Sequence, residues 1–410
     1  MTRFRLADLE TARTTDARVG LDRARYVCIA AGKAAAPMAK ATASVLKDRL
    51  RAGLLAAPAA EGFGSFEAIA AGHPVPDAGS ERAGRRALEI AAALRPDETL
   101  LVLLSGGASA LLAVPADGLS LDDKQRATAQ LLRTGADIHA LNTVRKHVSS
   151  IKGGWLASRS AGPVRTFVIS DVVGDDVSVI ASGPTVPDPS TFADARHLLD
   201  RYGGAAAYPA AVVARLDQGA RGEWPETPKP MHPRLVRSDI TVIGSRRDAM
   251  LGAAGRALGL GYEVVRIEDP VVGEARVAAV AHLRAAVASA QDRPRPLCVV
   301  SSGETTVNVT GHGKGGRNQE FALAAADLLS RLGAPAALAS IGTDGVDGPT
   351  DAAGALVDAT TIDRAHHAGL RPDRFLADNN AYAFFSALGD LIHTGPTGTN
   401  VGDLQVLLLG

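Results

Sequence analysis

The stretch Tyr26-Val27-Cys28-Ile29-Ala30-Ala31-Gly32-Lys33 decides the fold class. Its six apolar residues form a continuous run, which is typical of a strand buried on both faces of a parallel sheet. A Gly-Lys pair follows, and then an alanine-rich segment with helical character, residues 34–50. The stretch therefore predicts a strand that leads into a helix, the first half of a β–α–β unit.

The same alternation continues along the chain. Further strands are predicted at residues 67–71, 100–104, 164–169, 240–243, 263–267, 297–301, 336–341 and 404–409, and further helices at residues 81–94, 122–134, 138–149, 191–202, 247–258, 273–290 and 318–332. Alternating strands and helices predict an α/β fold with right-handed crossovers. We expect two Rossmann-like lobes with mainly parallel sheets and an active-site cleft between them. The proline-rich segment 219–233 places the boundary, giving domains 1–235 and 236–410.

Composition narrows the class of protein. The chain has 410 residues, which favours two domains. Its 44 Lys and Arg balance 44 Asp and Glu, so nothing in the charge supports nucleic-acid binding. No apolar run has the length of a membrane span, and residues 2–10 lack the apolar core of a signal peptide. Cys28 and Cys298 lie in apolar runs and are predicted to be buried free thiols. We expect a soluble cytoplasmic protein without nucleic-acid or membrane partners.

A glycine-rich loop occupies residues 311–316 and precedes a predicted helix. Glycines let a backbone approach an anion closely, and a helix N-terminus offers free N–H groups. Lys314 and Arg317 add two cations to four glycines, among them Gly316. The pattern favours a polyphosphate loop, and a flexible polar turn is the alternative.

Other polar clusters follow predicted strands, where ligands bind in open parallel sheets. The segment 105–109, Ser-Gly-Gly-Ala-Ser, is typical of an anion nest or of a capped turn. Asn142, Arg145 and Lys152 could hold a carboxylate or phosphate, or the helix could simply expose a basic face. The candidate anion-binding residues in this half are Ser105, Gly106, Gly107, Ser109, Asn142, Arg145 and Lys152.

Two acidic turns are candidates for a metal site. Asp171 and Asp175 follow the strand at 164–169, and Asp344 follows the strand at 336–341. Carboxylate oxygens suit Mg²⁺, which phosphoryl transfer uses to neutralise phosphate charge. Asp171 could instead be a base on a substrate hydroxyl. Solvated acidic turns are the alternative for both segments.

These motifs, taken in order, resemble the glycerate 2-kinase family, which combines an N-terminal α/β domain with a C-terminal domain named MOFRL. The residues that carry the resemblance, from about residue 26 to 403, are Ala31–Ala35, Gly72–Asp77, Leu104–Leu111, Asn142–His147, Ser170–Asp175, Ser182–Thr185, Ser302–Thr306, Gly316–Glu320 and Gly342–Gly348. So many ordered motifs make the resemblance specific.

The resemblance implies ATP-dependent phosphorylation of D-glycerate to 2-phosphoglycerate with a divalent metal, here Mg²⁺. It implies that Lys33, Asp171, Arg317 and Asp344 are catalytic, with Asp171, Asp175 and Asp344 as metal ligands. In the second half, the polar cluster after a predicted strand and the glycine-rich loop provide the candidate substrate- or phosphate-binding residues Ser302, Gly303, Glu304, Lys314, Gly316 and Asn318. Our hypothesis is that Lys33 and Arg317 stabilise charge on the transferring phosphoryl group, and that Asp171 or Asp344 orients or deprotonates the hydroxyl. The substrate carboxylate needs a cation, with Arg145 or Lys152 as candidates.

Two other classes of function stay open. Gly311, Gly313 and Gly316 satisfy the spacing of a dinucleotide turn, as in an NAD(P)H-dependent hydroxypyruvate reductase, a label that this family has often carried. That fingerprint needs an acid about 20 residues on at a strand end, and residues 331–340 contain none. A non-catalytic sugar-phosphate sensor would explain the anion loops but not the clustered aspartates. A homodimer is one candidate assembly that the sequence does not settle.

Overall fold

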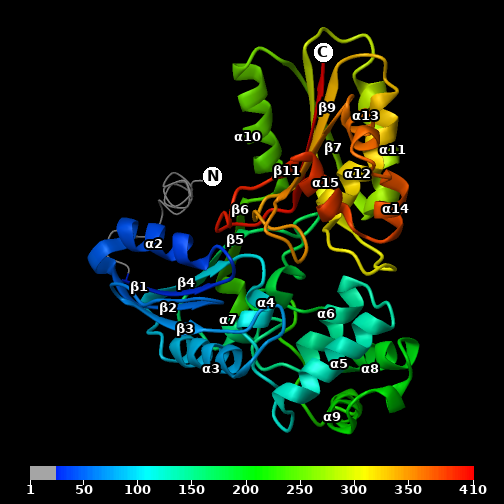
Figure 1. Cartoon of the computed structure of the whole chain (residues 1–410). Helices are drawn as coiled ribbons and strands as arrows, with labels where there is room; N and C mark the ends of the chain where they lie inside the picture. Colours follow the sequence, from blue (N-terminus) through cyan, green and yellow to red (C-terminus); the bar gives the residue numbers. More distant parts are fainter. Residues whose placement is uncertain (1–24) are drawn as a thin grey trace. The chain divides into compact units, whose positions relative to one another are not determined.

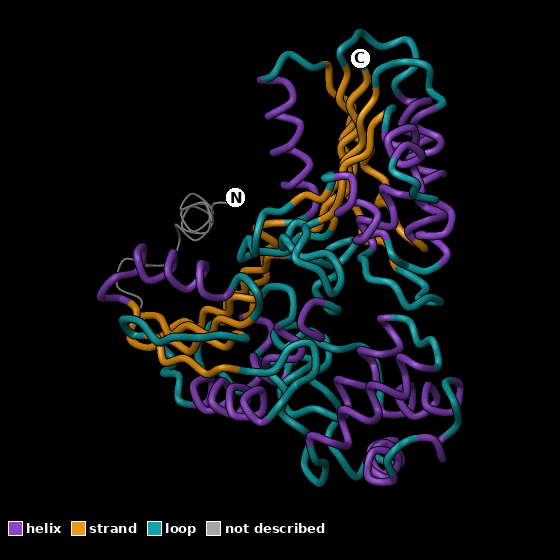
Figure 2. Tube along the Cα trace, in the orientation of Figure 1, coloured by secondary structure: helices purple, strands orange, loops and turns teal. Residues whose placement is uncertain are grey.

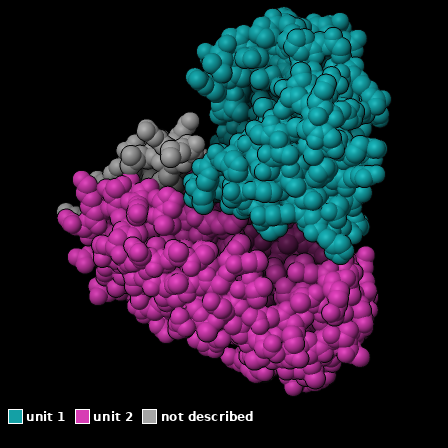
Figure 3. Space-filling model, viewed as in Figure 1, with its two compact units in different colours: residues 1–2, 244–410 teal, residues 3–243 magenta. Residues whose placement is uncertain are grey.

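The chain forms two compact units in this computed structural model, which describes residues 25–410 (Figures 1 and 3). We call residues 25–243 the N-terminal unit and residues 244–410 the C-terminal unit. The residues on which the signal-peptide expectation rests lie outside the described part of the chain. The division falls after Ile243 rather than after residue 235. The proline-rich segment is not a linker, because Thr227 Oγ1 and the Pro228 carbonyl bond to Asp188 of the N-terminal unit.

The strands of the N-terminal unit, orange in Figure 2, form a six-stranded sheet, and its order is β3-β2-β1-β4-β5-β6. The strands are β1 (Arg25–Ala31), β2 (Leu50–Ala57), β3 (Phe66–Ala70), β4 (Glu98–Leu104), β5 (Val164–Ile169) and β6 (Ser238–Gly244). The four pairs from β3 to β5 are parallel, as predicted. Every residue of β4 is buried, because helices cover both faces of the sheet, with α2 on one and α3 on the other (Figure 1).

The helices of the N-terminal unit form two groups. They are α2 (Ala35–Leu46), α3 (Ala78–Ala92), α4 (Ala108–Leu111), α5 (Leu121–Arg133), α6 (Ile138–His147), α7 (Trp155–Ser158), α8 (Phe192–Arg201) and α9 (Ala210–Ala220). Helices α5, α6, α8 and α9 have a core of their own, which includes Leu131, Val144, Phe192 and Leu216. Ser120 caps α5 and Asp137 caps α6 through their side-chain oxygens. This second core fixes the helices that carry Lys124, Asn142 and Arg145.

The strand order changes direction at β1, which lies between β2 and β4. The chain winds outward from β1 to β3 and then returns to the other side at β4. In open parallel sheets, ligands bind at such a switch point, beyond the carboxyl ends of the strands. Lys33 follows β1 and Ser105 follows β4, so the topology brings two predicted site residues to this point.

The C-terminal unit contains a second six-stranded sheet, in the order β11-β10-β9-β12-β8-β7. The strands are β7 (Glu263–Glu274), β8 (Leu297–Thr306), β9 (Ala336–Gly342), β10 (Gly354–Asp358), β11 (Leu391–Ile392) and β12 (Asp403–Leu409). The helices are α10 (Arg246–Gly259), α11 (Ala275–Ser289), α12 (Arg317–Ser330), α13 (Thr361–His367), α14 (Pro372–Ala377) and α15 (Ala381–Leu388).

The α/β class is confirmed, but the second sheet is not mainly parallel. Only β7 and β8 pair in parallel, and the other four pairs are antiparallel. The reason is the last strand: β8 and β9 are parallel to each other through a helical crossover, and β12 inserts antiparallel between them. A sequence pattern shows that a final strand exists, but it does not show where the strand inserts.

Two further sequence expectations can be compared with the structure. Within residues 25–410, no helix is both long and apolar enough to cross a lipid bilayer. Cys28 and Cys298 are both buried and form no disulfide, as predicted.

Candidate active site

The turns after β1 and β4 are hydrogen-bonded to each other at the switch point. The Lys33 N–H donates to the Gly106 carbonyl (2.9 Å), and the Ala34 N–H donates to Ser105 Oγ (2.9 Å). Gly32 has φ +126°, and a Cβ there would lie 2.1 Å from Ser105 Oγ, so only glycine allows this approach. The structure thus brings Lys33, Ser105 and Gly106 together.

The next turn places a histidine against the glycines. Gly107 has φ +87°, and a Cβ there would lie 2.7 Å from the His73 ring. Burial and then the charge of Lys33 lower the pKa of His73 below its ordinary value, which favours the neutral ring. The Gly72–Asp77 turn, quoted above only as a family motif, therefore belongs to this site.

A chain of hydrogen bonds joins four segments that are distant in sequence. Lys152 Nζ donates to the Ser109 carbonyl (2.7 Å) and to Ser109 Oγ (2.9 Å). Ser182 Oγ donates to Asn142 Oδ1 (2.8 Å), which leaves Ser109 Oγ as the donor to Ser182 Oγ (2.9 Å). Ala181 and Ser182 have φ of +53° and +61°, a left-handed conformation that costs non-glycine residues about 1–3 kcal/mol. The fold accepts this strain and thereby holds Ser182 between Ser109 and Asn142.

A cavity of about 590 Å³ opens beside these residues, entirely within the N-terminal unit. Its apolar lining includes Pro74, Val75, Pro76, Ala110, Ala129 and Leu132, and its cationic lining includes Lys124, Arg145 and Lys152. Lys124 and Lys152 are buried, and Lys124 Nζ donates to the Val114 carbonyl (3.2 Å). We call Lys124, Arg145 and Lys152 the cation cluster.

Within residues 25–410, no acid forms an ion pair with a member of the cation cluster. Burial, and then the charge of Arg145, lower the pKa of Lys124 to about 7. Burial, with the charges of Lys124 and Arg145, lowers the pKa of Lys152 well below its ordinary value. Burial also lowers the pKa of Arg145. Glu81, which ion-pairs with Arg85 (2.6 Å), acts on Lys124 in the opposite direction but more weakly. A bound anion raises the depressed pKa of a buried cation and so favours its charged form. The cluster is therefore suited to bind an anion.

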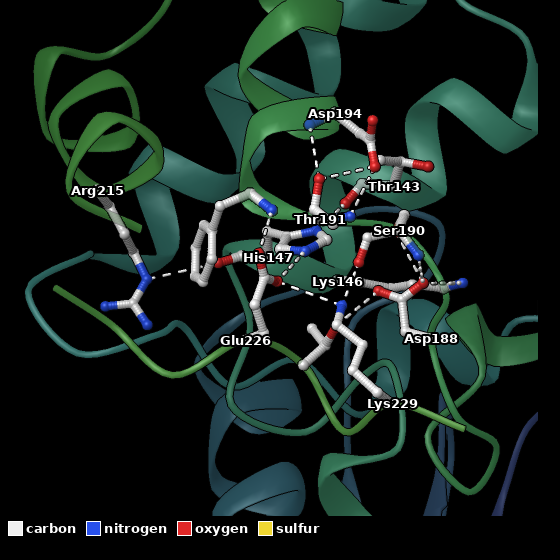
Figure 4. A network of polar contacts seen from close by, with 12 residues as sticks. Thr143, Lys146, His147, Asp188, Ser190, Thr191, Asp194, Arg215, Glu226 and Lys229 are labelled. Carbon is white, nitrogen blue, oxygen red and sulfur yellow. Dashed lines mark hydrogen bonds and ion pairs between the residues drawn. The ribbon is translucent and has the colours of Figure 1, made fainter. Parts of the chain in front are cut away.

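A polar network surrounds Lys146 and His147 at the end of α6 (Figure 4). Lys146 pairs with Asp188 (3.3 Å), and His147 Nε2 lies 3.2 Å from Glu226 Oε2. His147 Nδ1 lies 2.8 Å from the Thr143 carbonyl. Both partners of the ring are acceptors, so His147 can donate to both only in its doubly protonated form. The network ties α6 to the segments around residues 188 and 226.

The acidic turn after β5 provides oxygen ligands but not a complete metal site. Asp171 and Asp175 lie in this turn, and Asp176 accepts a hydrogen bond from the Ser178 N–H (2.8 Å). Among residues 25–410, no group of three or more His, Cys, Asp or Glu side chains could hold a metal ion. Mg²⁺ is commonly held by one or two carboxylates together with substrate phosphates, so the turn fits the ion only in that way.

The glycine-rich loop of the C-terminal unit differs from an open phosphate cradle. The N–H groups of residues 311–314 are bonded to the segment 378–380: those of Gly311, His312 and Lys314 donate to side-chain oxygens of Asn379, Asp378 and Asn380. The Gly313 N–H donates to the Asp378 carbonyl (2.8 Å), and a Cβ at Gly313 would lie 2.6 Å from that oxygen. Lys314 Nζ lies 4.7 Å from the centre of the Tyr382 ring. These glycines therefore serve close packing within the unit.

The start of α12 is also occupied. The N–H groups of Asn318 and Gln319 donate to the Asp347 carboxylate (3.0 and 2.9 Å). Burial raises the pKa of Asp347 to about 6 against the effect of these bonds. Gly316 packs on Asp347, with a hypothetical Cβ 2.3 Å from its Cγ. An acid therefore fills the place where a helix N-terminus would bind phosphate.

Arg317 is held by two carboxylates. It forms a bidentate pair with Asp403 (2.7 and 3.0 Å) and donates to Glu304 (2.8 Å). Although burial opposes the charge, Asp403 raises the pKa of Arg317 above its ordinary value. Asp403 is fully buried opposite Gly303 of β8 and Gly342 of β9. Asn318 Nδ2 also donates to Asp403 (2.9 Å), which makes this aspartate the centre of the cluster.

The remaining residues of the C-terminal prediction lie near this cluster in the sheet. Ser302 is buried on β8, with its Oγ 3.4 Å from Arg246 Nη1. Asp344 Oδ1 accepts from the Val346 N–H (3.1 Å) in the turn after β9. Asp344 therefore belongs to a different unit from Asp171 and Asp175, the other two predicted metal ligands.

These contacts bring to the two sites five residues that were not chosen as candidate site residues, although His73, Ser182 and Asp347 lie in the motifs that carry the resemblance. They are His73, Lys124 and Ser182 in the N-terminal unit and Asp347 and Asp403 in the C-terminal unit. Lys124 is one of only eight lysines and lies on a predicted helix, which is a weak signal that could have found it. Asp403 could not have been found in this way, because it reaches Arg317 only through the insertion of β12.

The fold and these sites define a two-unit α/β protein with a cavity in its N-terminal unit that is lined by Lys124, Arg145 and Lys152. Residues 5–217 match the family described as domain of unknown function DUF4147, and residues 297–403 match the MOFRL family. The chain is 40% identical to the D-glycerate 2-kinase of Thermotoga maritima, over 96% of this chain and 92% of that protein. It is 38% identical to the glycerate 2-kinase of Pyrococcus horikoshii, over 94% and 88%. The chain therefore belongs to the glycerate kinase family with DUF4147 and MOFRL domains.

Solved structures agree with this assignment. A crystal structure of glycerate kinase from Thermotoga maritima covers 98% of this chain, and 94% of that chain is covered, with a TM-score of 0.85 at 38% identity. A relative from Agrobacterium vitis, 41% identical over 95% of this chain and 88% of its own length, carries a provisional hydroxypyruvate reductase name.

Proposed function

We propose that this protein transfers the terminal phosphoryl group of ATP to D-glycerate and forms 2-phosphoglycerate. The similarity to a D-glycerate 2-kinase over 96% of the chain carries this proposal. The reaction brings two anionic substrates together, and the cation cluster provides the positive charge that such substrates need. Phosphoryl transfer requires positioning and charge stabilisation more than covalent chemistry, which fits a site rich in cations and fixed turns.

The proposed roles follow the positions of the side chains. Lys33, fixed at the switch point, stabilises charge on the transferring phosphoryl group, and Arg317 does so from the C-terminal unit. Asp171 or Asp344 orients the glycerate hydroxyl and accepts its proton. Asp171 and Asp175 would hold Mg²⁺ together with substrate phosphates, and the bound ion would neutralise phosphate charge.

The reductase alternative has less support. Its dinucleotide turn would require the N–H groups at Gly311 and Gly313 for a pyrophosphate, yet these groups bond to Asn379 and Asp378. No acid occurs at residues 331–340, where the ribose contact would be expected.

A paired product assay tests the proposal. The protein is incubated with ATP, Mg²⁺ and D-glycerate and analysed by ³¹P NMR, and NADH oxidation with hydroxypyruvate is followed in parallel. We expect a 2-phosphoglycerate signal and no loss of NADH. Loss of NADH without formation of a phosphoester would overturn the kinase proposal in favour of the reductase. If neither assay gives a signal, the result would favour a sensor.

Other expectations stay predictions of this proposal. These are a cytoplasmic location, the absence of nucleic-acid and membrane partners, an active site that closes between the lobes, and a homodimer as one candidate assembly.

A further inference from the structure

The cation cluster needs more negative charge than glycerate carries. Lys124, Arg145 and Lys152 together supply three positive charges when protonated, and glycerate has a single carboxylate. The cavity's own acid, Asp122, already pairs with Arg126 at 2.8 Å. Buried charges without partners are costly, so a single carboxylate would leave most of the cluster uncompensated. A ligand with several negative charges matches the cluster better.

The size of the cavity leads to the same conclusion. Its volume of about 590 Å³ lies in the range, roughly 300–1,000 Å³, that holds ligands of drug size. A three-carbon acid would leave much of it filled with water. The apolar lining from Pro74 to Pro76 on one segment, and from Ala129 and Leu132 on α5, offers a surface for a flat apolar group.

The glycine-rich loop does not compete for this ligand. The N–H groups at residues 310–314 are bonded to the segment 378–380, and Asp347 occupies the start of α12. A carboxylate in that position repels phosphate instead of binding it. Within residues 25–410, the cations that line the N-terminal cavity, Lys124, Arg145 and Lys152, therefore remain as candidates for the phosphates of a nucleotide.

We infer that the cavity of the N-terminal unit is the nucleotide site, with the polyphosphate on Lys124, Arg145 and Lys152 and the base against the apolar lining. This assignment rests on the proposed kinase function. It gives Lys124, on α5, a role in binding phosphate. It also assigns Arg145 and Lys152 to the nucleotide, whereas the sequence had made them candidates for binding the glycerate carboxylate.

Calorimetric titration of ADP into the full chain without glycerate tests the phosphate contact. Lys124→Met is compared with Arg126→Met, because Arg126 lines the same cavity on the same helix but is neutralised by Asp122 and Asp123 (2.8 and 3.0 Å). We expect Lys124→Met to raise the Kd for ADP about tenfold or more, the loss typical of a charge-assisted contact, and Arg126→Met to change it less than about twofold. At saturating ATP, the KM for D-glycerate should change less than about threefold.

The opposite pattern overturns the assignment. If Lys124→Met leaves the Kd for ADP unchanged and raises the KM for D-glycerate, the cavity is the hydroxy-acid site. The same conclusion would follow if Lys124→Met weakened the binding of 2-phosphoglycerate more than the binding of ADP. Melting temperatures of the variants show whether a loss reflects unfolding.

A second variant tests the base without touching the cations. Ala129 is exposed on α5, so Ala129→Trp fills the apolar part of the cavity with little risk to folding. We expect it to weaken ADP binding and to leave inorganic tripolyphosphate binding unchanged. Equal ADP affinity in the variant and the wild type would show that the base lies elsewhere.

Proton uptake provides an independent measurement. The charged groups around Lys124 are Arg145, Lys152, Glu81, Asp122 and Arg126. With the pKa of Lys124 near 7, much of this lysine is neutral at pH 8, and a bound polyphosphate would raise that pKa. ADP binding at pH 8 should therefore take up protons, as a different apparent enthalpy in Tris and in HEPES would show. Lys152, whose pKa is also lowered, would add to this uptake, so only an uptake that Lys124→Met leaves undiminished would count against Lys124 as the contact.

The outcomes separate this inference from the proposed function. If ADP binding depends on Lys124 and Ala129 but glycerate is not phosphorylated, the proposed kinase function is wrong and the cavity assignment stands. If the protein phosphorylates glycerate but neither substitution changes its affinity for ADP, the kinase proposal stands and the cavity assignment is wrong.

Discussion

Lys33 is the residue whose removal should separate catalysis from folding. Its backbone is fixed by the bond to Gly106, so the substitution Lys33→Ala changes the side chain and leaves the turn intact. We expect kcat/KM to fall by about 10²–10³, the usual cost of losing a charge-stabilising donor, with little change in melting temperature. A coupled assay of ADP release measures it, and Lys40→Ala, on the exposed side of α2, is the control. Near-normal kcat/KM in Lys33→Ala would refute the role.

Arg317 differs from Lys33 because it also holds the C-terminal unit together. Its partner Asp403 is fully buried and would be left without its cation in Arg317→Ala. Breaking one side of a buried ion pair costs about 3–5 kcal/mol, so we expect a clearly lower melting temperature as well as lost activity. Adding Asp403→Asn should recover part of the stability but not the activity. Arg317→Ala with wild-type stability would contradict this dual role.

Several residues of the candidate site could be chosen from the sequence because local chemistry marks them. Lys33, Ser105 and Asp171 follow apolar strands directly, and strand ends of a parallel sheet meet at one edge. Lys124 and Asp403 carry no such mark, since each joins its site only through packing of distant segments. The glycine-rich loop shows the converse: its pattern predicts a phosphate cradle, but the partners in the segment 378–380 are invisible to a local pattern.

At the scale of single elements, the network behind α6 predicts how stability depends on pH. Burial raises the pKa of Glu226, but the hydrogen bonds from His147 and Phe192 N–H, with the charge of Lys229, lower it from 4.5 to about 2. A carboxylate with a depressed pKa stabilises the fold fully above its unfolded value and loses this effect as pH falls from about 4.5 to 2. We expect the melting temperature of the wild type to fall across this window, and that of Glu226→Gln to fall less. Identical slopes would argue against an ionised Glu226 in the network.

Elements were predictable where the hydrophobic pattern was unambiguous. Strand β5 was predicted with its exact bounds, because its apolar run ends sharply at Ser170. Strand β2 was missed, because Leu50–Ala57 is rich in leucine and alanine and continues the pattern of the helix before it. Strand β6 was assigned to the second domain, although it belongs to the first sheet. Local propensity does not decide such pairings; the neighbouring strands do.

At the scale of the whole molecule, the residues proposed for catalysis are divided between two units that each have their own core. Lys33 and Asp171 belong to the N-terminal unit, and Arg317 and Asp344 to the C-terminal unit. If all four act on one phosphoryl group, the substrates must contact both units at once, and a closed complex would also keep water from accepting the phosphate. We expect ADP with D-glycerate to reduce the radius of gyration measured by small-angle X-ray scattering, and ADP alone to have a smaller effect. Equal dimensions under all conditions would show that the units do not close, and that catalysis needs only one of them or a fixed arrangement of both.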